Sequence, residues 1–278
     1  MIGILLISIG TFFEEVAATI GKQKVLQKEQ SVYTMAFLSL FWGTIFFLLI
    51  SLAQHQGFIF SLASLPTFIP RIFLEIFQTH VTVLAIAYAD RSTTNFVRMA
   101  TIPLLLLADI ALGYHITSFQ VIGIFIILSA LLFVFLDKSI NKKGARYALL
   151  SAVNAVATLS LYKYDIAHYN SIAAEQLIVS GILLVYFFFF ANFFLKENPV
   201  VFLKRRIFFV QSFSDGLGSV VQSFAYGFAP ASVILAGKRS SAVVWAVISG
   251  KVYFGEQQFF LRVILLLFVI LGLVFLAL

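Results

Sequence analysis

The sequence predicts an all-α polytopic membrane protein, and three observations support this fold class. Hydrophobic residues make up 61% of the 278 residues and charged residues only 11%, whereas soluble domains carry about 25% charged residues. The apolar residues form ten runs of about 20 residues, the length of helix that crosses a bilayer core about 30 Å thick. Hydrophobicity within these runs does not alternate, as it would in the strands of a membrane β-barrel.

Each expected transmembrane helix is one apolar run, and short charged loops separate the runs. Almost nothing is left for a soluble domain. No cleavable signal is expected, because the first run lacks a basic start and contains Glu14 and Glu15 in place of a small-residue cleavage site. In chain order, the ten expected helices are Ile2–Ile20, Val32–Ala53, Ile72–Ala89, Asn95–Leu112, Phe119–Leu136, Tyr147–His168, Ala173–Leu195, Ile207–Phe228, Ser232–Tyr253 and Phe259–Leu278.

Basic residues are unevenly divided between the loops. By the positive-inside rule, the odd-numbered loops face the cytoplasm and both termini lie outside. These loops also account for the net charge of +7, so nucleic acid is not an expected partner. The even-numbered loops and the termini contain a single basic residue, Arg71. The odd-numbered loops contain Lys22, Lys24, Lys28, Arg91, Lys138, Lys142, Lys143, Arg146, Lys196, Lys204, Arg205, Arg206 and Lys251.

A weak internal repeat relates the two halves of the chain. The stretch EVAATIGKQK (Glu15–Lys24) aligns without gaps with NAVATLSLYK (Asn154–Lys163). Each half, residues 1–143 and residues 144–278, then holds five helices, and an odd number of helices inserts the two copies in opposite orientations. The expected architecture is therefore two inverted five-helix repeats, in which substrate sites usually lie near the bilayer midplane at the repeat interface.

The last third of the chain has a short helix, a Gly-Glu turn, an arginine and a final helix with a late glycine. In this pattern, and in helix number and order, the chain resembles the ten-helix EamA-type branch of the drug/metabolite transporter superfamily. The resemblance implies a transporter fold without specifying a substrate. Glu256, at a helix junction, is expected to be a cap or topology residue. The first half departs from the pattern at Tyr114 and His115, where the family often has an acid. The residues that carry the resemblance are Gly255, Glu256, Arg262 and Gly272, with Pro103, Gly113, Gln120 and Gly123 in the first half.

Two shorter resemblances concern charged residues. EEVAAT is similar to the first helix of small multidrug resistance transporters, which implies proton and cation binding by Glu15, Val16 and Thr19. The pair Lys238 and Arg239 is similar to a Lys-Arg pair that holds the substrate phosphate in plastid phosphate translocators. Members of the superfamily usually have both termini in the cytoplasm. The loop charges indicate the reverse, so the orientation stays open.

Ionisable residues within the expected helices are candidate site residues, because a charge at membrane depth is costly. Glu15 shares a helix face with Thr19 and Lys22, and Glu14 points about 100° away. We expect Glu15 to be the proton-coupling residue, and the alternative is a salt bridge with Lys22 near the membrane surface. The repeat places Asn154 at the position equivalent to Glu15, which adds a second polar group to the expected substrate site.

Three cationic residues, Arg98, Lys238 and Arg239, lie a few residues inside two helices that the repeat makes equivalent. We expect them to converge on one cavity and bind an anionic or zwitterionic substrate, because guanidinium and ammonium groups suit carboxylate and phosphate. The alternative is that they pair with buried acids such as Asp215 or Glu75, without a ligand role.

Other polar residues complete the candidate set. Asp215 lies among serines and glycines, which leave room between helices, and is expected to line the cavity. Tyr88 and Tyr226 match across the repeat and are expected beside the cavity, with a place in the interfacial aromatic belt as the alternative. Asp165 and Glu175 flank a loop and are expected to be solvated.

These features favour a secondary transporter that moves a small organic metabolite across a bacterial inner membrane by alternating access, with coupling to protons through Glu15. Two other functions stay open: an intramembrane enzyme that acts on a lipid-linked substrate, and a membrane scaffold that transports nothing. An enzyme is not expected, because no acid–base or metal-ligand cluster occurs on a loop. No cofactor or metal is expected. The expected partners are a small-molecule substrate, protons and the lipid bilayer, and the protein is expected to be a monomer or homodimer.

Overall fold

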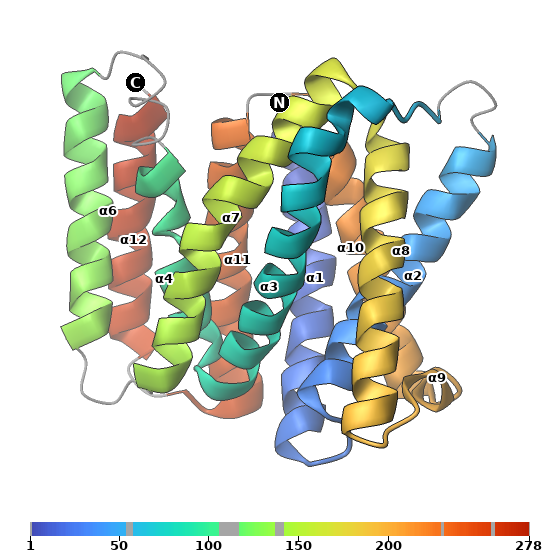
Figure 1. The fold of residues 1–278 in the computed structure, drawn as a ribbon. Coiled ribbons are helices and arrows are strands. Elements are labelled where there is room, and N and C mark those ends of the chain that lie inside the picture. The colour runs from blue at the N-terminus through green and yellow to red at the C-terminus, as the bar shows by residue number, and fades with distance from the viewer. Residues whose placement is uncertain are drawn as a thin grey trace.

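The computed structural model describes residues 2–53, 58–105, 117–136, 142–228, 231–256 and 259–277. Within these ranges the chain is helical and has no strand, which confirms the all-α prediction (Figure 1). Gly113, Tyr114 and His115 lie outside the described residues, as does the side chain of Gln120. The long helices are α1 (Ile2–Leu26), α2 (Val32–Ala53), α3 (Leu65–Tyr88), α6 (Ser118–Leu136), α7 (Lys142–His168), α8 (Ile172–Phe189), α10 (Arg206–Ala225), α11 (Ala231–Phe254) and α12 (Phe259–Ala277). The shorter elements are η1 (Leu62–Ser64), α4 (Arg91–Arg98), η2 (Phe190–Phe194) and α9 (Pro199–Phe202).

Four helical stretches of the described chain are long and apolar enough to cross a membrane. Large apolar side chains also point outward, where a soluble protein would place more polar groups. Phe73 is 68% exposed, Phe125 72% and Phe260 82%. Helix length and an apolar surface together indicate a membrane protein. The four stretches are Ile2–Leu26, Val32–Ala53, Leu62–Tyr88 and Ile172–Phe194.

Three helices begin several residues earlier than their apolar runs, because their first turns contain polar residues that hydropathy does not count. α3 begins at Leu65 rather than Ile72, α4 at Arg91 rather than Asn95, and α7 at Lys142 rather than Tyr147. Pro66 stands in the first turn of α3, where its missing N–H leaves no helical hydrogen bond unmade. Apolar runs therefore locate these helices but not their first turns.

The fourth expected helix, Asn95–Leu112, is interrupted. α4 ends at Arg98, helical structure resumes at residues 101–105, and the remainder of the expected helix lies outside the described residues. Pro103 has no N–H to donate to the carbonyl of Met99, and its ring crowds that carbonyl, so the α-helical ladder is broken here. The break leaves Arg98 at the end of a short helix.

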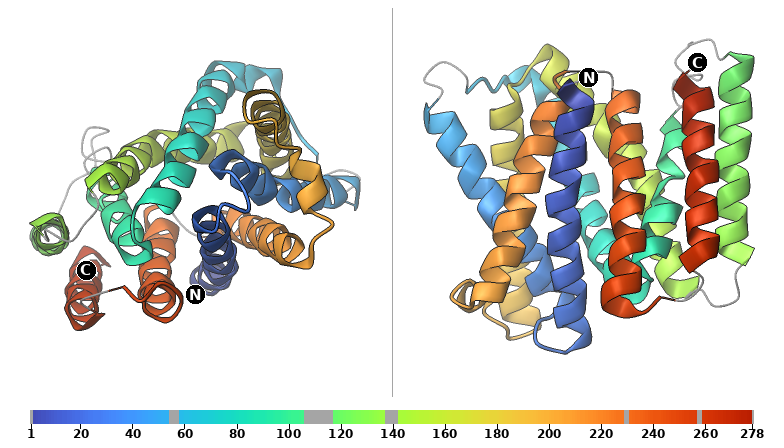
Figure 2. Two further views of the ribbon diagram at one scale, coloured as in Figure 1. Left: turned by 90° about the horizontal axis from the view of Figure 1, so that it is seen from below. Right: turned by 180° about the vertical axis from the view of Figure 1, so that it is seen from behind.

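Close packing between α1 and α10 forms the centre of the bundle. A Cβ atom on Gly218 of α10 would lie 2.7 Å from the carbonyl oxygen of Gly10 of α1, so only small residues permit this approach. α1 also packs on α11, α7 packs on α3 and α4, and α2 packs on α8 and α10. α6 and α12 pair at one side of the bundle (Figure 2).

One end of the bundle carries basic residues from two distant segments. The turn after α1 and the short α9 lie at the end opposite both termini (Figures 1 and 2). Glu29 links these segments, because it pairs with Lys24 at 2.7 Å and with Arg205 at 2.8 Å. The hydrogen bond from Lys24, together with Arg205, lowers the pKa of Glu29 below its ordinary value. Lys28 and Lys204 are exposed in the same segments.

Candidate functional site

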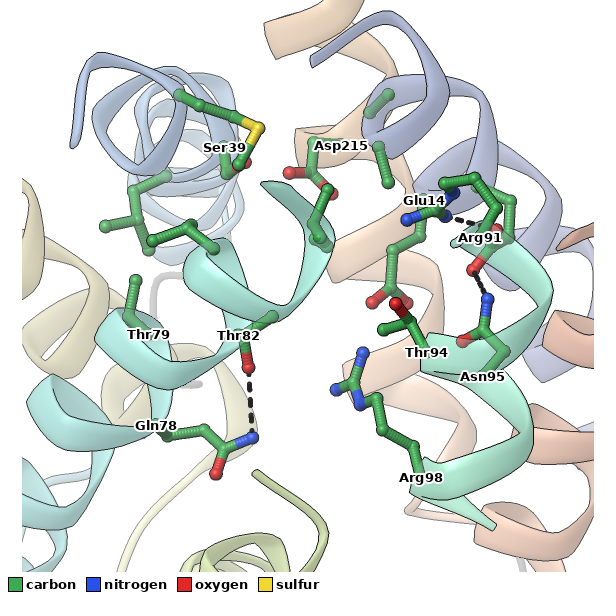
Figure 3. Close-up of a pocket in the computed structure, with 17 residues that line it drawn as sticks. Glu14, Ser39, Gln78, Thr79, Thr82, Arg91, Thr94, Asn95, Arg98 and Asp215 are labelled. Carbon is green, nitrogen blue, oxygen red and sulfur yellow. Dashed lines mark hydrogen bonds and ion pairs between the residues drawn. The ribbon is translucent and has the colours of Figure 1, made fainter. Parts of the chain in front are cut away.

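The bundle contains a cavity with two adjoining lobes, and charged and polar side chains stand in the walls of both. The first lobe, of about 210 Å³, is lined by residues of α1, α2, α3, α4 and α10. The second lobe, of about 240 Å³, adds residues of α7, α8 and α11. Glu14, Ser39 and Asp215 lie in the walls of both lobes. Figure 3 shows Glu14, Arg98 and Asp215 pointing into the first lobe from three different helices.

Glu14 stands between the two lobes and is ion-paired. Its carboxylate lies 2.9 Å from Lys238 Nζ and accepts a 2.7 Å hydrogen bond from Gln222 Nε2. Lys238 also donates to Gln222 Oε1 at 2.6 Å, so the three side chains link α1, α10 and α11. Sequence reasoning set Glu14 aside in favour of the Glu15 face. The polar Gln222 inside an apolar run was the available signal that a second polar face of α1 meets the cavity.

Glu15 is buried and is held by α4. Arg91 Nη2 lies 2.5 Å from one carboxylate oxygen, and Asn95 Nδ2 donates to the other at 2.9 Å. The alternative salt bridge with Lys22 is not made, since Lys22 Nζ donates to the backbone carbonyl of Ala89. Arg91 and Asn95 thus contact both carboxylate oxygens of Glu15, and its role in proton coupling stays a prediction.

Arg98 and Arg239 have no carboxylate partner among the described residues. Arg98 lines the first lobe, and its buried Nε has no hydrogen-bond partner in the described chain. Arg239, which was expected in the cavity, lines neither lobe. It is 3% exposed, its Nε is also unpartnered in the described chain, and its Nη2 lies 3.5 Å from Thr101 Oγ1. The alternative of ion pairs with Asp215 or Glu75 is not observed for these two arginines. Their arrangement leaves guanidinium donors available to an anion.

Asp215 lies on α10, in the walls of both lobes. Ser39 of α2 lies beside it (Figure 3). Within the described chain, no basic side chain is within ion-pair distance of its carboxylate. Gly216 follows it and packs against Gly43 and the backbone of Trp42, so α2 and α10 cross closely at this point. The close crossing holds the Asp215 carboxylate at the junction of the lobes.

Asn154, Tyr226 and Tyr88 occupy three different environments. Asn154 is 8% exposed and donates to Gln78 Oε1 at 2.9 Å, so it supports a residue that lines the first lobe. Tyr226 lines the second lobe. Tyr88 is 43% exposed and stacks on Tyr147; it lines neither lobe. Tyr88 therefore lies at the surface of the bundle, where the alternative of a belt of interfacial aromatic residues would place it.

The expectation that Asp165 and Glu175 are solvated is wrong, because both are 0% exposed. Glu175 is ion-paired with Arg71 and accepts a 2.5 Å hydrogen bond from Asn170. Asp165 accepts a 2.5 Å hydrogen bond from Thr67. These acids flank the connection between α7 and α8, and the segment before α3 folds over that connection. Proximity to a loop in sequence therefore did not mean exposure.

Glu256 caps α4, in keeping with its expected role at a helix junction. Its carboxylate accepts a 2.5 Å hydrogen bond from the backbone N–H of Arg91 and a bond from the Ser92 hydroxyl, and it pairs with Arg262. A negative charge at this place is favoured by the helix dipole. The cap holds the start of the short helix that ends with Arg98.

A scan against family models finds no match for the chain, and no curated protein sequence is significantly similar to it. The resemblance to the drug/metabolite transporter superfamily therefore stays a prediction. Within the described ranges, no group of three or more His, Asp or Glu side chains gathers as a metal site. The site instead offers acids, guanidinium groups and an ammonium group around an internal cavity, a set suited to binding a charged organic molecule.

Proposed function

We propose that the protein is a secondary transporter that moves a small organic anion or zwitterion by alternating access. It would have ten spans in two inverted halves, residues 1–143 and residues 144–278. The observation that carries the proposal is a cavity inside an apolar bundle whose walls contain charged side chains, among them Arg98, a guanidinium group without a carboxylate partner in the described chain. Unpaired charge at membrane depth is costly, and a transported anion would complete the pairing.

The helix contacts support the inverted arrangement. α1 packs on α10 and α11, and its repeat equivalent α7 packs on α3 and α4. Three further helices each pack on their own repeat equivalent: α2 on α8, α4 on α11, and α6 on α12. A two-fold axis in the membrane plane would produce this exchange of partners.

The charged side chains suggest how a substrate would be held. Arg98, in the wall of the first lobe, would approach its carboxylate or phosphate from the first half of the chain. Lys238, in the wall of the second lobe, would approach it from the second half. Guanidinium groups bind planar anions with two parallel hydrogen bonds. Because Lys238 is paired with Glu14 at 2.9 Å, the substrate anion would compete with Glu14 for this ammonium group.

Two buried polar links join the proposed halves near the cavity. Arg71, which lines the second lobe, pairs with Glu175. Arg91, which lines the first lobe, donates its backbone N–H to Glu256. Alternating access would break these links in turn, so that the cavity opens to one side of the membrane at a time.

Counterflow in proteoliposomes tests the proposal. The purified chain would be reconstituted and screened with labelled organic acids, amino acids and phosphate esters. Flux of at least one class is expected. Arg98→Gln should raise its KM about tenfold with little change in kcat, because a charge-assisted hydrogen bond contributes about 1.5–3 kcal/mol. Lys204→Gln, at the exposed basic end, is the matched control. A folded protein without flux of any class would overturn the proposal.

A further inference from the structure

Four carboxylates line the two lobes of the cavity, and they differ in their partners. Glu14 is paired with Lys238 at 2.9 Å, Glu15 with Arg91 at 2.5 Å, and Glu75 with Arg71 Nε at 3.7 Å. Asp215 is the exception: among the described residues it has no cation within ion-pair distance. Ser39 lies beside it (Figure 3).

An ion-paired carboxylate is stabilised in its charged form by the cation and by hydrogen bonds that donate to it. Glu14 and Glu15 each have such a donor in addition, from Gln222 and Asn95. A carboxylate inside an apolar bundle without a cation bears the cost of its charge, and uptake of a proton removes that cost. Proton binding at Asp215 therefore requires no ion pair to be broken.

The position of Asp215 also suits a group that meets each side of the membrane in turn. It lies in the walls of both lobes. α10 is packed against α1 and α2 through glycines, so a small movement of these helices would change which lobe its carboxylate faces. Glu15 and Glu75 line one central lobe each.

We infer that Asp215 is the carboxylate that takes up and releases the coupled proton. The inference rests on the proposed transport function. In each cycle, one Asp215 carboxylate oxygen accepts a proton from water on one side of the membrane, forming an O–H bond, and returns it to water on the other side. No other group is consumed or oxidised.

The charged neighbours of Asp215 come from several helices. α1 supplies Glu14 and Glu15, and α11 supplies Lys238. α2 has no charged residue in its described length, and Glu175 of α8 is paired with Arg71. The remaining charged groups in the lobe walls are Glu75 and Arg71 on α3 and Arg91 and Arg98 on α4.

Infrared difference spectroscopy of the full chain in phosphatidylglycerol–phosphatidylethanolamine vesicles tests the site, with the proton itself as the probe. The wild type should show a protonated-carboxyl C=O band that changes with pH. Asp215→Asn should remove this band, whereas the matched amides Glu14→Gln, Glu15→Gln and Glu75→Gln should retain it. Asp215→Glu should keep a band at a shifted frequency, which controls for folding.

Three results would each overturn the inference. The band could persist in Asp215→Asn, it could be lost in Glu15→Gln alone, or it could be absent from the wild type. Flux provides the second readout. Asp215→Asn should reduce uptake driven by a pH gradient to background while exchange at equal pH continues, and loss of both equally would also overturn the inference. A wild type without any flux would instead overturn the proposed function, since the infrared spectra locate the proton independently of transport.

Discussion

At the scale of single residues, the most deeply buried ion pair joins Arg71 of α3 to Glu175 of α8. Arg71 is 1% exposed and Glu175 0%, and they pair across the two predicted halves. We predict that Arg71→Gln lowers the free energy of unfolding by about 3–5 kcal/mol, because it leaves Glu175 as an uncompensated buried charge. Thermal unfolding in detergent measures the loss. The double variant Arg71→Gln/Glu175→Gln should recover part of it.

The matched control is an ion pair of the same residue types at the surface. Arg205 and Glu29 pair at 2.8 Å with side chains that are 57% and 31% exposed. Water screens the attraction in an exposed pair, so Arg205→Gln should change the unfolding free energy little. Equal losses in the two single variants would contradict the view that burial makes the Arg71 pair important.

Residue partners were the least predictable part of the site. Helix periodicity correctly separated the directions of Glu14 and Glu15, but it could not show which helix packs on each direction. Arg91 was assigned to a loop, yet it is 1% exposed and pairs with Glu15. Asp165 was assigned to solvent because it is close to a loop in sequence, yet it is buried. Partners 76 and 98 positions away in the chain are set by tertiary packing, which one sequence does not reveal.

At the scale of helices, hydropathy located most elements and missed their irregularities. α2 has the predicted bounds, Val32–Ala53, because charged or polar residues end the apolar run at both sides. α4 is shorter than predicted because Pro103 interrupts the ladder, a signal that was present in the sequence but was read only as part of a family pattern. Apolar runs report where a helix is buried in lipid, and local backbone chemistry decides whether it is continuous.

The α1–α10 crossing yields a prediction at this scale. A Cβ atom on Gly218 would lie 2.7 Å from Gly10 O and 3.0 Å from Glu14 N. We predict that Gly218→Ala forces the helices apart and lowers the unfolding free energy by about 1–3 kcal/mol, the usual cost of overpacking. The same shift should displace Glu14 from Lys238. Thermal unfolding in detergent measures the first effect.

Gly181 of α8 is the control for Gly218, because a Cβ atom there would meet no atom within 4 Å. Gly181→Ala should be neutral or stabilising by up to about 1 kcal/mol, the difference in helix propensity between the two residues. If both alanine variants behave alike, the destabilisation comes from backbone effects and the close crossing is not responsible.

At the scale of the whole molecule, basic residues gather at the end opposite the termini, and this asymmetry makes the topology testable. The chain has no cysteine, so single cysteines can be introduced without background. Lys28 follows α1 and Lys204 follows α9. The segment before α3 lies at the other end of the bundle (Figure 1), and Leu62 in this segment is 75% exposed. By the positive-inside rule, a membrane-impermeant maleimide applied to intact cells should label Leu62→Cys but not Lys28→Cys or Lys204→Cys. Permeabilised cells should show labelling of all three.

The reverse pattern would place the basic end outside, in agreement with the usual orientation of the superfamily that the sequence resembles. Labelling of Lys28→Cys and Lys204→Cys from opposite sides would contradict the bundle itself, because Glu29 joins those two segments through Lys24 and Arg205.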